Sequence, residues 1–279
     1  MLLVHGLTYP GSAAFDLPLG GSSWMEHLAR RGSDVWSVDV RGYGGSTPPE
    51  AMDQPPDRNP PLLDAAMGSA DVAAAADCIR RERGVARLAV VGWSWGTVLA
   101  ARLATSRPQA VDRLVLYAPV WRWPGGTLPW PPAGAYRAVT TEAARRTWLS
   151  GVPAAAQASL IPDGWFEQWA AANWATDPVG ARAQPRVLRA PNGPLVEVVQ
   201  AWSGGRVLFD AAAIRARTLV VVGEWDSTTP PPMARALHAT LAPSIDASFA
   251  LISEGTHQVF LERNRELLFA AVDAFLECA

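Results

Sequence analysis

The chain has 279 residues and a formal net charge of −2, and all 24 of its basic side chains are arginine. The absence of lysine excludes Schiff-base catalysis, a Gly-Lys-Ser/Thr phosphate loop and kinase-type chemistry. A near-neutral chain without a basic block argues against a nucleic-acid partner, and no apolar run reaches the roughly 18 residues that span a bilayer. Cys78 and Cys278 share no motif, so neither a disulfide framework nor a thiolate metal site is expected.

The first part of the chain alternates short apolar runs with helical patterns. The Ala-rich stretch before Gly84 predicts a helix with Ser69 as its N-cap. Because no signal-peptide pattern precedes the first strand, we expect a cytoplasmic protein, unless the true start lies upstream. The expected order is a strand at residues 1–4, a helix at 22–31, a strand at 35–38, a turn-rich loop at 39–47, an irregular stretch at 47–61, a helix at 69–83, a strand at 87–91, a helix at 97–106 and a strand at 113–117.

The same alternation returns near the C-terminus, with strands at residues 218–222 and 248–252 and a last helix at 258–276. Short apolar strands that alternate with helices predict an α/β fold, with a mostly parallel sheet and helices on both faces. Residues 119–210 lack this alternation. We therefore expect a core made of residues 1–118 and 211–279, with a mainly helical, Trp-rich cap inserted at residues 119–210.

The segment Gly92-Trp93-Ser94-Trp95-Gly96 lies between a predicted strand and a predicted helix. A Gly-x-Ser-x-Gly sequence in this context is typical of a sharp turn that lifts the serine hydroxyl above the sheet edge. The pentapeptide alone is weak support, since glycine and serine are common, but the flanking strand and helix supply the context that the motif requires. We predict that Ser94 is a nucleophile.

A serine hydroxyl becomes a good nucleophile when a base takes its proton. Of the four histidines, only His257 lies in a loop after a predicted strand and downstream of Ser94, as the chain order Ser…Asp…His requires. We expect His27 and His238 to be surface residues of helices, and His5 to order the loop in which it lies.

A carboxylate must hold the histidine in the correct tautomer. Asp226 follows the predicted strand at 218–222 and is the first choice for this role, with Glu224 in the same loop as the alternative. The loop after the strand at 113–117 holds no acid, which disfavours a variant geometry. Asp39 also ends a strand, but we expect it to anchor the Gly-rich turn that follows.

Acyl transfer also requires hydrogen-bond donors for the oxyanion. The backbone N–H of Trp95 directly follows the nucleophile and is one such donor. The loop after the first strand supplies the second, for which Leu7 is the natural candidate and Thr8 its neighbour.

Together these residues resemble the α/β-hydrolase superfamily, and among its members a capped, esterase-like serine hydrolase. The similarity covers most of the chain. The resemblance implies a Ser94–Asp226–His257 triad, a cap after the sixth strand of the family's sheet, and catalysis without a cofactor or a metal. The motifs that carry it are His5-Gly6, the Gly-rich loop after Asp39, Gly92-x-Ser94-x-Gly96, Gly223-x-x-Asp226 and Gly255-x-His257.

The chain also departs from the family's usual pattern. Two strands usually precede the His-Gly strand, and this chain has no room for them. Prolyl iminopeptidases carry Gly-Gly-Pro-Gly where this chain has Leu7-Thr8-Tyr9-Pro10. Haloalkane dehalogenases and many epoxide hydrolases have an aspartate in place of Ser94, so both activities are disfavoured.

Tryptophan is unusually frequent, with 13 residues against 4 Tyr and 7 Phe. Any one of them can simply pack the cap against the core. Collectively they predict a dry, apolar acyl or aryl pocket, with Trp93, Trp165 and Trp169 as expected substrate contacts. Trp165 and Trp169 share a helical face at i, i+4. Eight lie in the expected cap: Trp121, Trp123, Trp130, Trp148, Trp165, Trp169, Trp174 and Trp202.

We expect a serine hydrolase that cleaves a small-molecule carboxylic ester through an acyl-enzyme on Ser94. An amidase or aminopeptidase, a lactonase, a thioesterase and a carbon–carbon bond hydrolase can use the same triad. Glu142 or Glu167 could bind the amine of an aminopeptidase substrate. An alternative of a different class is a non-catalytic ligand receptor on the same fold. No membrane partner is expected, and a homo-oligomer stays open.

Overall fold

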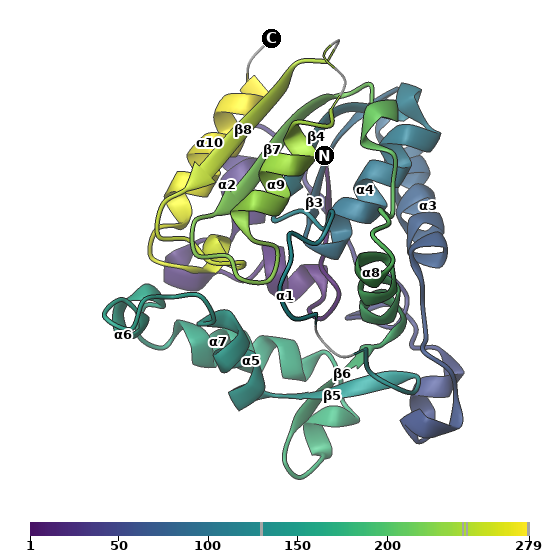
Figure 1. Cartoon of the computed structure of the whole chain (residues 1–279), viewed down its shortest axis with the longest axis vertical. Helices are drawn as coiled ribbons and strands as arrows, with labels where there is room; N and C mark the ends of the chain where they lie inside the picture. The colour runs from purple at the N-terminus through teal and green to yellow at the C-terminus, as the bar shows by residue number, and fades with distance from the viewer. Residues whose placement is uncertain (129–130, 242, 244, 278–279) are drawn as a thin grey trace.

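The computed structural model describes residues 1–128, 131–241, 243 and 245–277 (Figure 1). Trp130 and Cys278 therefore lie outside the described residues. In this part of the chain, no helix is both long enough and apolar enough to cross a bilayer.

Six parallel strands form the central sheet in the order β2-β1-β3-β4-β7-β8, which confirms the expected α/β class. The chain runs outward from β1 to β2 and then crosses back to β3, so the strand order reverses between β1 and β3. In open α/β sheets, ligands bind at the carboxyl ends of the strands beside such a reversal. The strands are β1 (Leu2–Val4), β2 (Trp36–Val38), β3 (Leu88–Trp93), β4 (Val111–Tyr117), β7 (Arg217–Gly223) and β8 (Ala247–Ile252).

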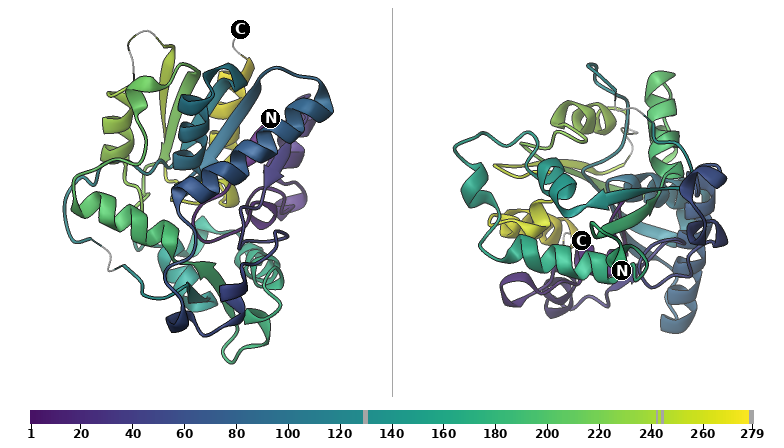
Figure 2. Two further views of the ribbon diagram at one scale, coloured as in Figure 1. Left: turned by 90° about the vertical axis from the view of Figure 1, so that its right-hand side faces the viewer. Right: turned by 90° about the horizontal axis from the view of Figure 1, so that it is seen from below.

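Helices cover both faces of the sheet (Figures 1 and 2). One face packs against α3 (Ala65–Arg83), α4 (Trp95–Ser106) and α9 (Pro231–His238). The other packs against α1 (Gly11–Phe15), α2 (Trp24–Arg30) and α10 (Arg265–Glu277). Short 3-10 helices connect these elements: η1 (Leu19–Gly21), η2 (Glu50–Asp53), η3 (Pro56–Arg58), η4 (Pro108–Ala110), η5 (Gly180–Arg182), η6 (Ala211–Ala213) and η7 (Val259–Leu261).

The strand side chains alternate between the two layers. Val90 and Leu114 pack on the α3–α4 side, whereas Val91 and Val115 pack on the α2–α10 side. All four are almost fully buried. Burial of such a side chain stabilises the fold by roughly 1.5–3 kcal/mol, which is why these strands read as continuous apolar runs.

Several helix ends differ from the expectation. The helix expected from Ser69 begins at Ala65, because the Asp64 side chain accepts the Met67 N–H at 2.8 Å and serves as N-cap. The last helix begins at Arg265, after η7, rather than at residue 258. Asp64 lies five positions before the expected N-cap Ser69, so the helix gains its first turn at the N-terminal end.

The segment between β4 and β7 lies beyond the carboxyl ends of the strands (Figure 1). Besides helices, it contains an antiparallel strand pair that the sequence patterns did not predict. The delimitation of a cap at residues 119–210 stays a prediction. The segment between β4 and β7 contains β5 (Tyr136–Thr140), α5 (Thr141–Trp148), α6 (Gln157–Leu160), α7 (Trp165–Ala175), β6 (Val187–Pro191) and α8 (Gly193–Ser203).

The β5–β6 pair is fastened to its surroundings by a buried ion pair and by backbone contacts. Arg189 Nη2 lies 2.7 Å from Asp177 Oδ1, and both side chains are less than a tenth exposed. Arg189 also donates to the Met52 carbonyl, and the Tyr136 hydroxyl donates to the Gln54 carbonyl at 2.9 Å. The irregular stretch around residues 50–58 therefore supports this strand pair.

A close contact between α3 and α4 predicts the effect of adding a side chain at Gly68. A Cβ at Gly68 would lie 2.7 Å from Trp95 Cη2 and 3.1 Å from both methyl groups of Leu99. We expect Gly68→Val to lower the free energy of unfolding by about 1–3 kcal/mol, because the added carbons have no free space. Ala70→Val, on the exposed side of α3, is the control and should cost less than about 1 kcal/mol. Urea unfolding measures both, and equal losses would contradict the packing argument.

Candidate active site

Ser94 lies at the turn between β3 and α4 in a strained backbone conformation, with φ 57° and ψ −123°. Such a conformation in a residue other than glycine costs roughly 1–3 kcal/mol and persists only where packing enforces it. A Cβ at Gly92 would lie 2.4 Å from the Gly96 carbonyl oxygen, and one at Gly96 would lie 2.2 Å from the Val4 carbonyl oxygen. Glycine is therefore required at both positions for α4 to begin so close to the sheet.

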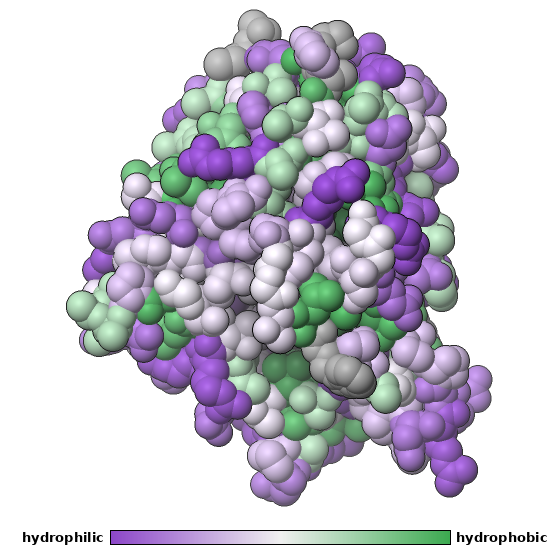
Figure 3. Space-filling view, in the orientation of Figure 1, coloured by the Kyte–Doolittle hydropathy of each residue, from purple (hydrophilic) through white to green (hydrophobic). Residues whose placement is uncertain are grey.

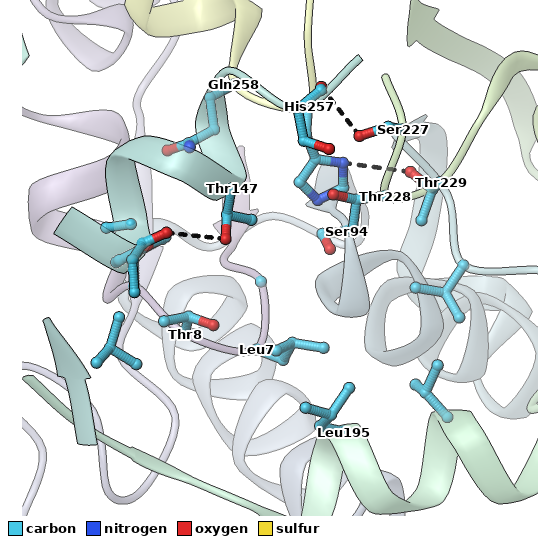
Figure 4. A pocket seen from close by; sticks show the side chains of 18 of the residues that line it. Leu7, Thr8, Ser94, Thr147, Leu195, Ser227, Thr228, Thr229, His257 and Gln258 are labelled. Carbon is cyan, nitrogen blue, oxygen red and sulfur yellow. Dashed lines mark hydrogen bonds between the residues drawn. The ribbon is translucent and has the colours of Figure 1, made fainter. Parts of the chain in front are cut away.

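The structure brings His257 and Asp226 together. His257 Nδ1 lies 2.8 Å from Asp226 Oδ2, and the Asp226 side chain is fully buried. Both residues come from loops at the carboxyl ends of neighbouring strands, β8 and β7. The His257 ring points toward Ser94, and both residues lie at the wall of a cavity (Figure 4). A carboxylate on Nδ1 directs the other ring nitrogen, Nε2, toward proton transfer.

The loop after β7 holds the Asp226 carboxylate in place. Its Oδ1 accepts the backbone N–H groups of Thr228 and Thr229, each at 2.9 Å, and its Oδ2 accepts the Thr229 hydroxyl at 3.0 Å. Thr229 Oγ1 also lies 3.3 Å from His257 Nδ1. Sequence reasoning missed Thr229, although an Asp followed by hydroxyl residues at +2 and +3 is a signal for this kind of turn.

Two side chains hold the backbone of the His257 loop. Trp93 Nε1 and the Tyr117 hydroxyl each donate to the His257 carbonyl at 2.9 Å. The Tyr117 oxygen in turn accepts the Val259 N–H at 3.0 Å. Burial raises the pKa of Tyr117, and the nearby carboxylates of Glu262 and Asp226 act in the same direction. Tyr117 is therefore a neutral donor under ordinary conditions.

The loop at residues 5–9 follows β1 and passes directly beside Ser94, and we call it the oxyanion loop after the role expected for it from the sequence. A Cβ at Gly6 would lie 3.1 Å from Ser94 Cβ and 3.6 Å from Ser94 Oγ, so the backbone approaches the Ser94 side chain closely. No hydrogen bond among the described residues uses the N–H of Leu7. Trp95 is the first residue of α4, where backbone N–H groups have no partner within the helix. Both N–H groups are therefore free to bind an oxyanion.

His5 orders this loop, as expected. Its ring is fully buried, with Nδ1 2.6 Å from the Gly6 carbonyl oxygen and Nε2 3.0 Å from the Val40 N–H. Because Val40 donates to Nε2, the proton lies on Nδ1 and is donated to Gly6. Burial lowers the pKa of His5, which keeps the ring neutral. The Gly6 carbonyl is thereby fixed, and the N–H of Leu7 in the same peptide is oriented with it.

A cavity of about 810 Å³ opens beside Ser94 and His257. On the face drawn in Figure 3, hydrophobic residues gather around a hollow in the lower half of the molecule. The oxyanion loop, the Ser94 turn and the Asp226 loop line the cavity together with β5, α5 and α8. Small-molecule sites typically have volumes of roughly 300–1,000 Å³, so the cavity suits a ligand of that size.

Some of the tryptophans line the cavity, and others lie away from it. Trp93, Trp123 and Trp202 line the cavity, and the last two rings pack 4.7 Å apart. The structure does not bring Trp165 and Trp169 to the cavity lining.

Trp165 and Trp169 instead pack the segment between β4 and β7 against the core. The Trp165 ring lies below the Arg265 guanidinium at 4.7 Å, and the fully buried Trp169 packs edge-on against Tyr9 at 4.6 Å. The i, i+4 spacing identified their shared helical face, but it carried no information about what lies beneath that face.

The other candidates take structural roles. Glu224 is exposed and accepts the Glu254 N–H at 3.0 Å, away from His257. His27 pairs with Asp273 of α10 at 2.8 Å. Asp39 accepts the N–H groups of Gly11 and Gly45, which anchors the Gly-rich turn as expected.

The sequence profile of the α/β-hydrolase fold matches residues 1–263. The chain belongs to the α/β-hydrolase family. A search of the curated proteins gives no significant match.

Solved structures of similar fold include several hydrolases. A 2-hydroxy-6-oxo-6-phenylhexa-2,4-dienoate hydrolase from a Rhodococcus strain has 16% identity and a TM-score of 0.67, over 99% of this chain and 90% of that one. A hydrolase from Pseudomonas aeruginosa has 19% identity and a TM-score of 0.63, over 99% and 90%. A thermophilic esterase from Thermogutta terrifontis has 20% identity and a TM-score of 0.55, over 99% and 88%. At these identities the likeness shows the shared fold.

This α/β hydrolase also buries a carboxyl group directly behind its histidine loop. Glu262 is fully buried and accepts hydrogen bonds from the Thr256 N–H at 3.1 Å, from the Thr256 hydroxyl and from Trp148 Nε1 at 2.8 Å. Burial raises the pKa of Glu262 to about 7, against the opposing effect of these donors. Glu262 thus connects α5 to the residue that precedes His257.

The raised pKa of Glu262 predicts a pH-dependent stability. The folded protein keeps the Glu262 proton at pH values where the unfolded chain has lost it, so stability falls as the pH rises from about 4 toward 7 and is level above that. We expect this group to contribute a decrease of at most about 3 kcal/mol. Glu262→Gln should remove that part of the pH slope in urea unfolding.

Glu266→Gln is the matched control, since Glu266 is largely exposed and pairs with Arg265 on the surface. It should leave the pH dependence of unfolding as in the unmodified protein. A Glu262→Gln protein with an unchanged slope would contradict the prediction.

Proposed function

We propose that this α/β hydrolase is a serine hydrolase that cleaves carboxylic esters with an apolar acyl or aryl group. One observation carries the proposal. The strained Ser94 turn lies beside a histidine whose Nδ1 is 2.8 Å from a fully buried aspartate, at the wall of a ligand-sized cavity. These are the three groups that acyl transfer requires, in the chain order of this family.

In the proposed reaction, Ser94 Oγ attacks the ester carbonyl while His257 Nε2 takes its proton. The carbonyl oxygen becomes negative and is held by the N–H groups of Leu7 and Trp95. Collapse of the tetrahedral intermediate breaks the ester bond, and His257 returns the proton to the departing alcohol. Water then attacks the acyl-enzyme by the same steps, with His257 as the base, and releases the acid.

We propose that residues 119–210 act as a cap that shapes the substrate side of the cavity. Trp123, Val139, Leu195 and Trp202 contribute apolar surface to its lining. A lining of this kind favours an apolar acyl or aryl group and limits the access of water. The partner is accordingly a small molecule rather than a polymer.

The cavity gives little support to an aminopeptidase. Such an enzyme binds a substrate ammonium group, for which a carboxylate in the lining is the expected partner. Glu142 and Glu167 are both largely exposed, pair with Arg146 and Arg145, and do not line the cavity. Lactones, thioesters and carbon–carbon bonds remain substrates that the same residues could cleave. A panel of esters, amides, thioesters and lactones of varied acyl length would rank them.

The first test of this proposal replaces the proposed nucleophile. Ser94→Ala should reduce turnover of p-nitrophenyl acyl esters by at least about 10³-fold, since the attacking group is lost. A fluorophosphonate probe should label the unmodified protein at Ser94 and leave Ser94→Ala unlabelled. Wild-type turnover by Ser94→Ala would refute the mechanism. A correctly folded protein that is neither labelled nor active would instead favour a ligand receptor.

A second test distinguishes the two candidate acids. Asp226→Asn should lower kcat by about 10²–10⁴-fold, because an amide can hold His257 in the wrong tautomer. Glu224→Gln is the matched control, and its kcat should change less than about threefold, because the exposed Glu224 carboxylate accepts a backbone N–H of the neighbouring loop, away from His257. The reverse ranking in steady-state kinetics would reassign the acid to Glu224.

A further inference from the structure

We propose that Arg137 is a positioning residue for the oxyanion loop, and that its unpaired positive charge favours the oxyanion that forms there. The inference rests on the proposed function, because an oxyanion arises only if Ser94 performs acyl transfer. Sequence patterns did not single out Arg137, which lies in β5, far along the chain from the loop that it contacts.

The contacts of Arg137 connect three separate segments. Its Nη2 donates to the Leu7 carbonyl at 2.9 Å and to the Thr8 hydroxyl at 2.7 Å, and its Nη1 donates to the Pro191 carbonyl at 2.8 Å. The Leu7 carbonyl also accepts the Tyr43 hydroxyl at 2.8 Å. Two donors on one carbonyl fix the Leu7–Thr8 peptide, which adjoins the peptide that carries the Leu7 N–H.

The charge of Arg137 has no carboxylate partner among the described residues. The titratable groups that interact with its charge are the phenols of Tyr43 and Tyr9. Burial raises the pKa of both phenols well above the physiological range, so both are neutral. Burial also lowers the pKa of Arg137, but a guanidinium stays protonated in proteins. Arg137 and Arg146 both line the cavity, and Arg146 is paired with Glu142.

Arg137 is half-buried at the cavity wall, and a cation without a carboxylate partner in such a place is destabilising unless other groups compensate it. Backbone and hydroxyl oxygens do so only in part, because none of them carries a full negative charge. A negative charge that develops nearby compensates it further, and the proposed oxyanion at the Leu7 N–H would form beside the loop that Arg137 contacts. Fixed charge and dipoles aimed at a developing charge lower the barrier without reorganisation. The same guanidinium therefore both orients the loop and favours the transition state.

The alternative is that Arg137 binds an anionic group of the substrate. Two of its three hydrogen bonds, however, are directed at the oxyanion loop, which commits one edge of the guanidinium to that loop. A positioning role and a substrate-binding role make different kinetic predictions. The first lowers kcat for neutral esters, whereas the second raises KM selectively for esters with a carboxylate group.

The test compares Arg137→Gln and Arg137→Lys with the unmodified protein. On a neutral ester, Arg137→Gln should lower kcat by roughly 10- to 100-fold and change KM by less than about threefold. Arg137→Lys keeps the charge and should recover part of the loss. A trifluoromethyl ketone, which adds Ser94 Oγ to give an anionic tetrahedral oxygen, should bind Arg137→Gln more weakly by a similar factor. The corresponding methyl ketone should bind both proteins equally.

Arg189→Gln is the matched control. Arg189 lies on β6, paired with the position next to Arg137, and it supports the same two-stranded sheet without contacting the oxyanion loop. It should lower stability but leave kcat unchanged at temperatures below its unfolding transition. If Arg137→Gln behaves in the same way, the positioning role is wrong. A rise in KM confined to carboxylate-bearing esters, with kcat unchanged, would also overturn it.

Thr8→Val keeps the inference testable if Arg137→Gln does not fold. It removes one hydrogen-bond partner of the guanidinium and leaves the charge of Arg137 in place, and it should lower kcat several-fold with little change in KM. An unchanged kcat would refute the positioning role. Fluorophosphonate labelling separates this result from the main proposal. An unlabelled wild-type protein refutes the serine hydrolase, whereas normal labelling with normal kinetics of the Arg137 and Thr8 variants refutes only this inference.

Discussion

Backbone crowding around Gly92 and Gly96 sets the geometry on which the rest of the site depends. Helix α4 begins so close to the end of β1 that neither position tolerates a Cβ, and Ser94 between them adopts a positive φ. This crowding places Ser94, the proposed nucleophile, against the oxyanion loop and leaves the N–H of Trp95 at the start of the helix. The packing of α4 in the interior supplies the free energy that holds the strained turn.

The sequence could predict where the candidate catalytic residues lie because their loops obey a topological rule. Ser94, Asp226 and His257 each follow an apolar strand, and parallel strands deliver such residues to one edge of the sheet. Contacts that depend on the segment between β4 and β7 could not be derived in the same way. Strand β5 pairs with β6, which follows three further α-helices along the chain, so neither the strand pair nor Arg137 has a local signal. Periodicity placed Trp165 and Trp169 on one helical face, but it could not show that Trp169 packs against Tyr9 instead of contacting a substrate.

Arginine side chains connect distant segments of this chain, which contains no lysine. Arg137, Arg189 and Arg265 each donate to backbone carbonyls of distant segments. A planar guanidinium with five donors can join several carbonyls at once, whereas an ammonium group offers a compact point charge. Composition therefore has a structural consequence here, because arginine links residues 119–210 to loops of the core at several points.

The pairing of β4 with β7 also bears on the order in which the protein assembles. Arg113 pairs with Arg217, so this contact encloses the whole inserted segment, and closing such a long loop carries a large entropic penalty. Ser94, Leu7 and Trp95 all precede this junction, while Asp226 and His257 follow it. The proposed nucleophile and the proposed base thus come from two parts of the chain on either side of the inserted segment. A nascent chain that ends after β4 contains Ser94 but neither Asp226 nor His257, so it lacks the groups proposed to activate the serine.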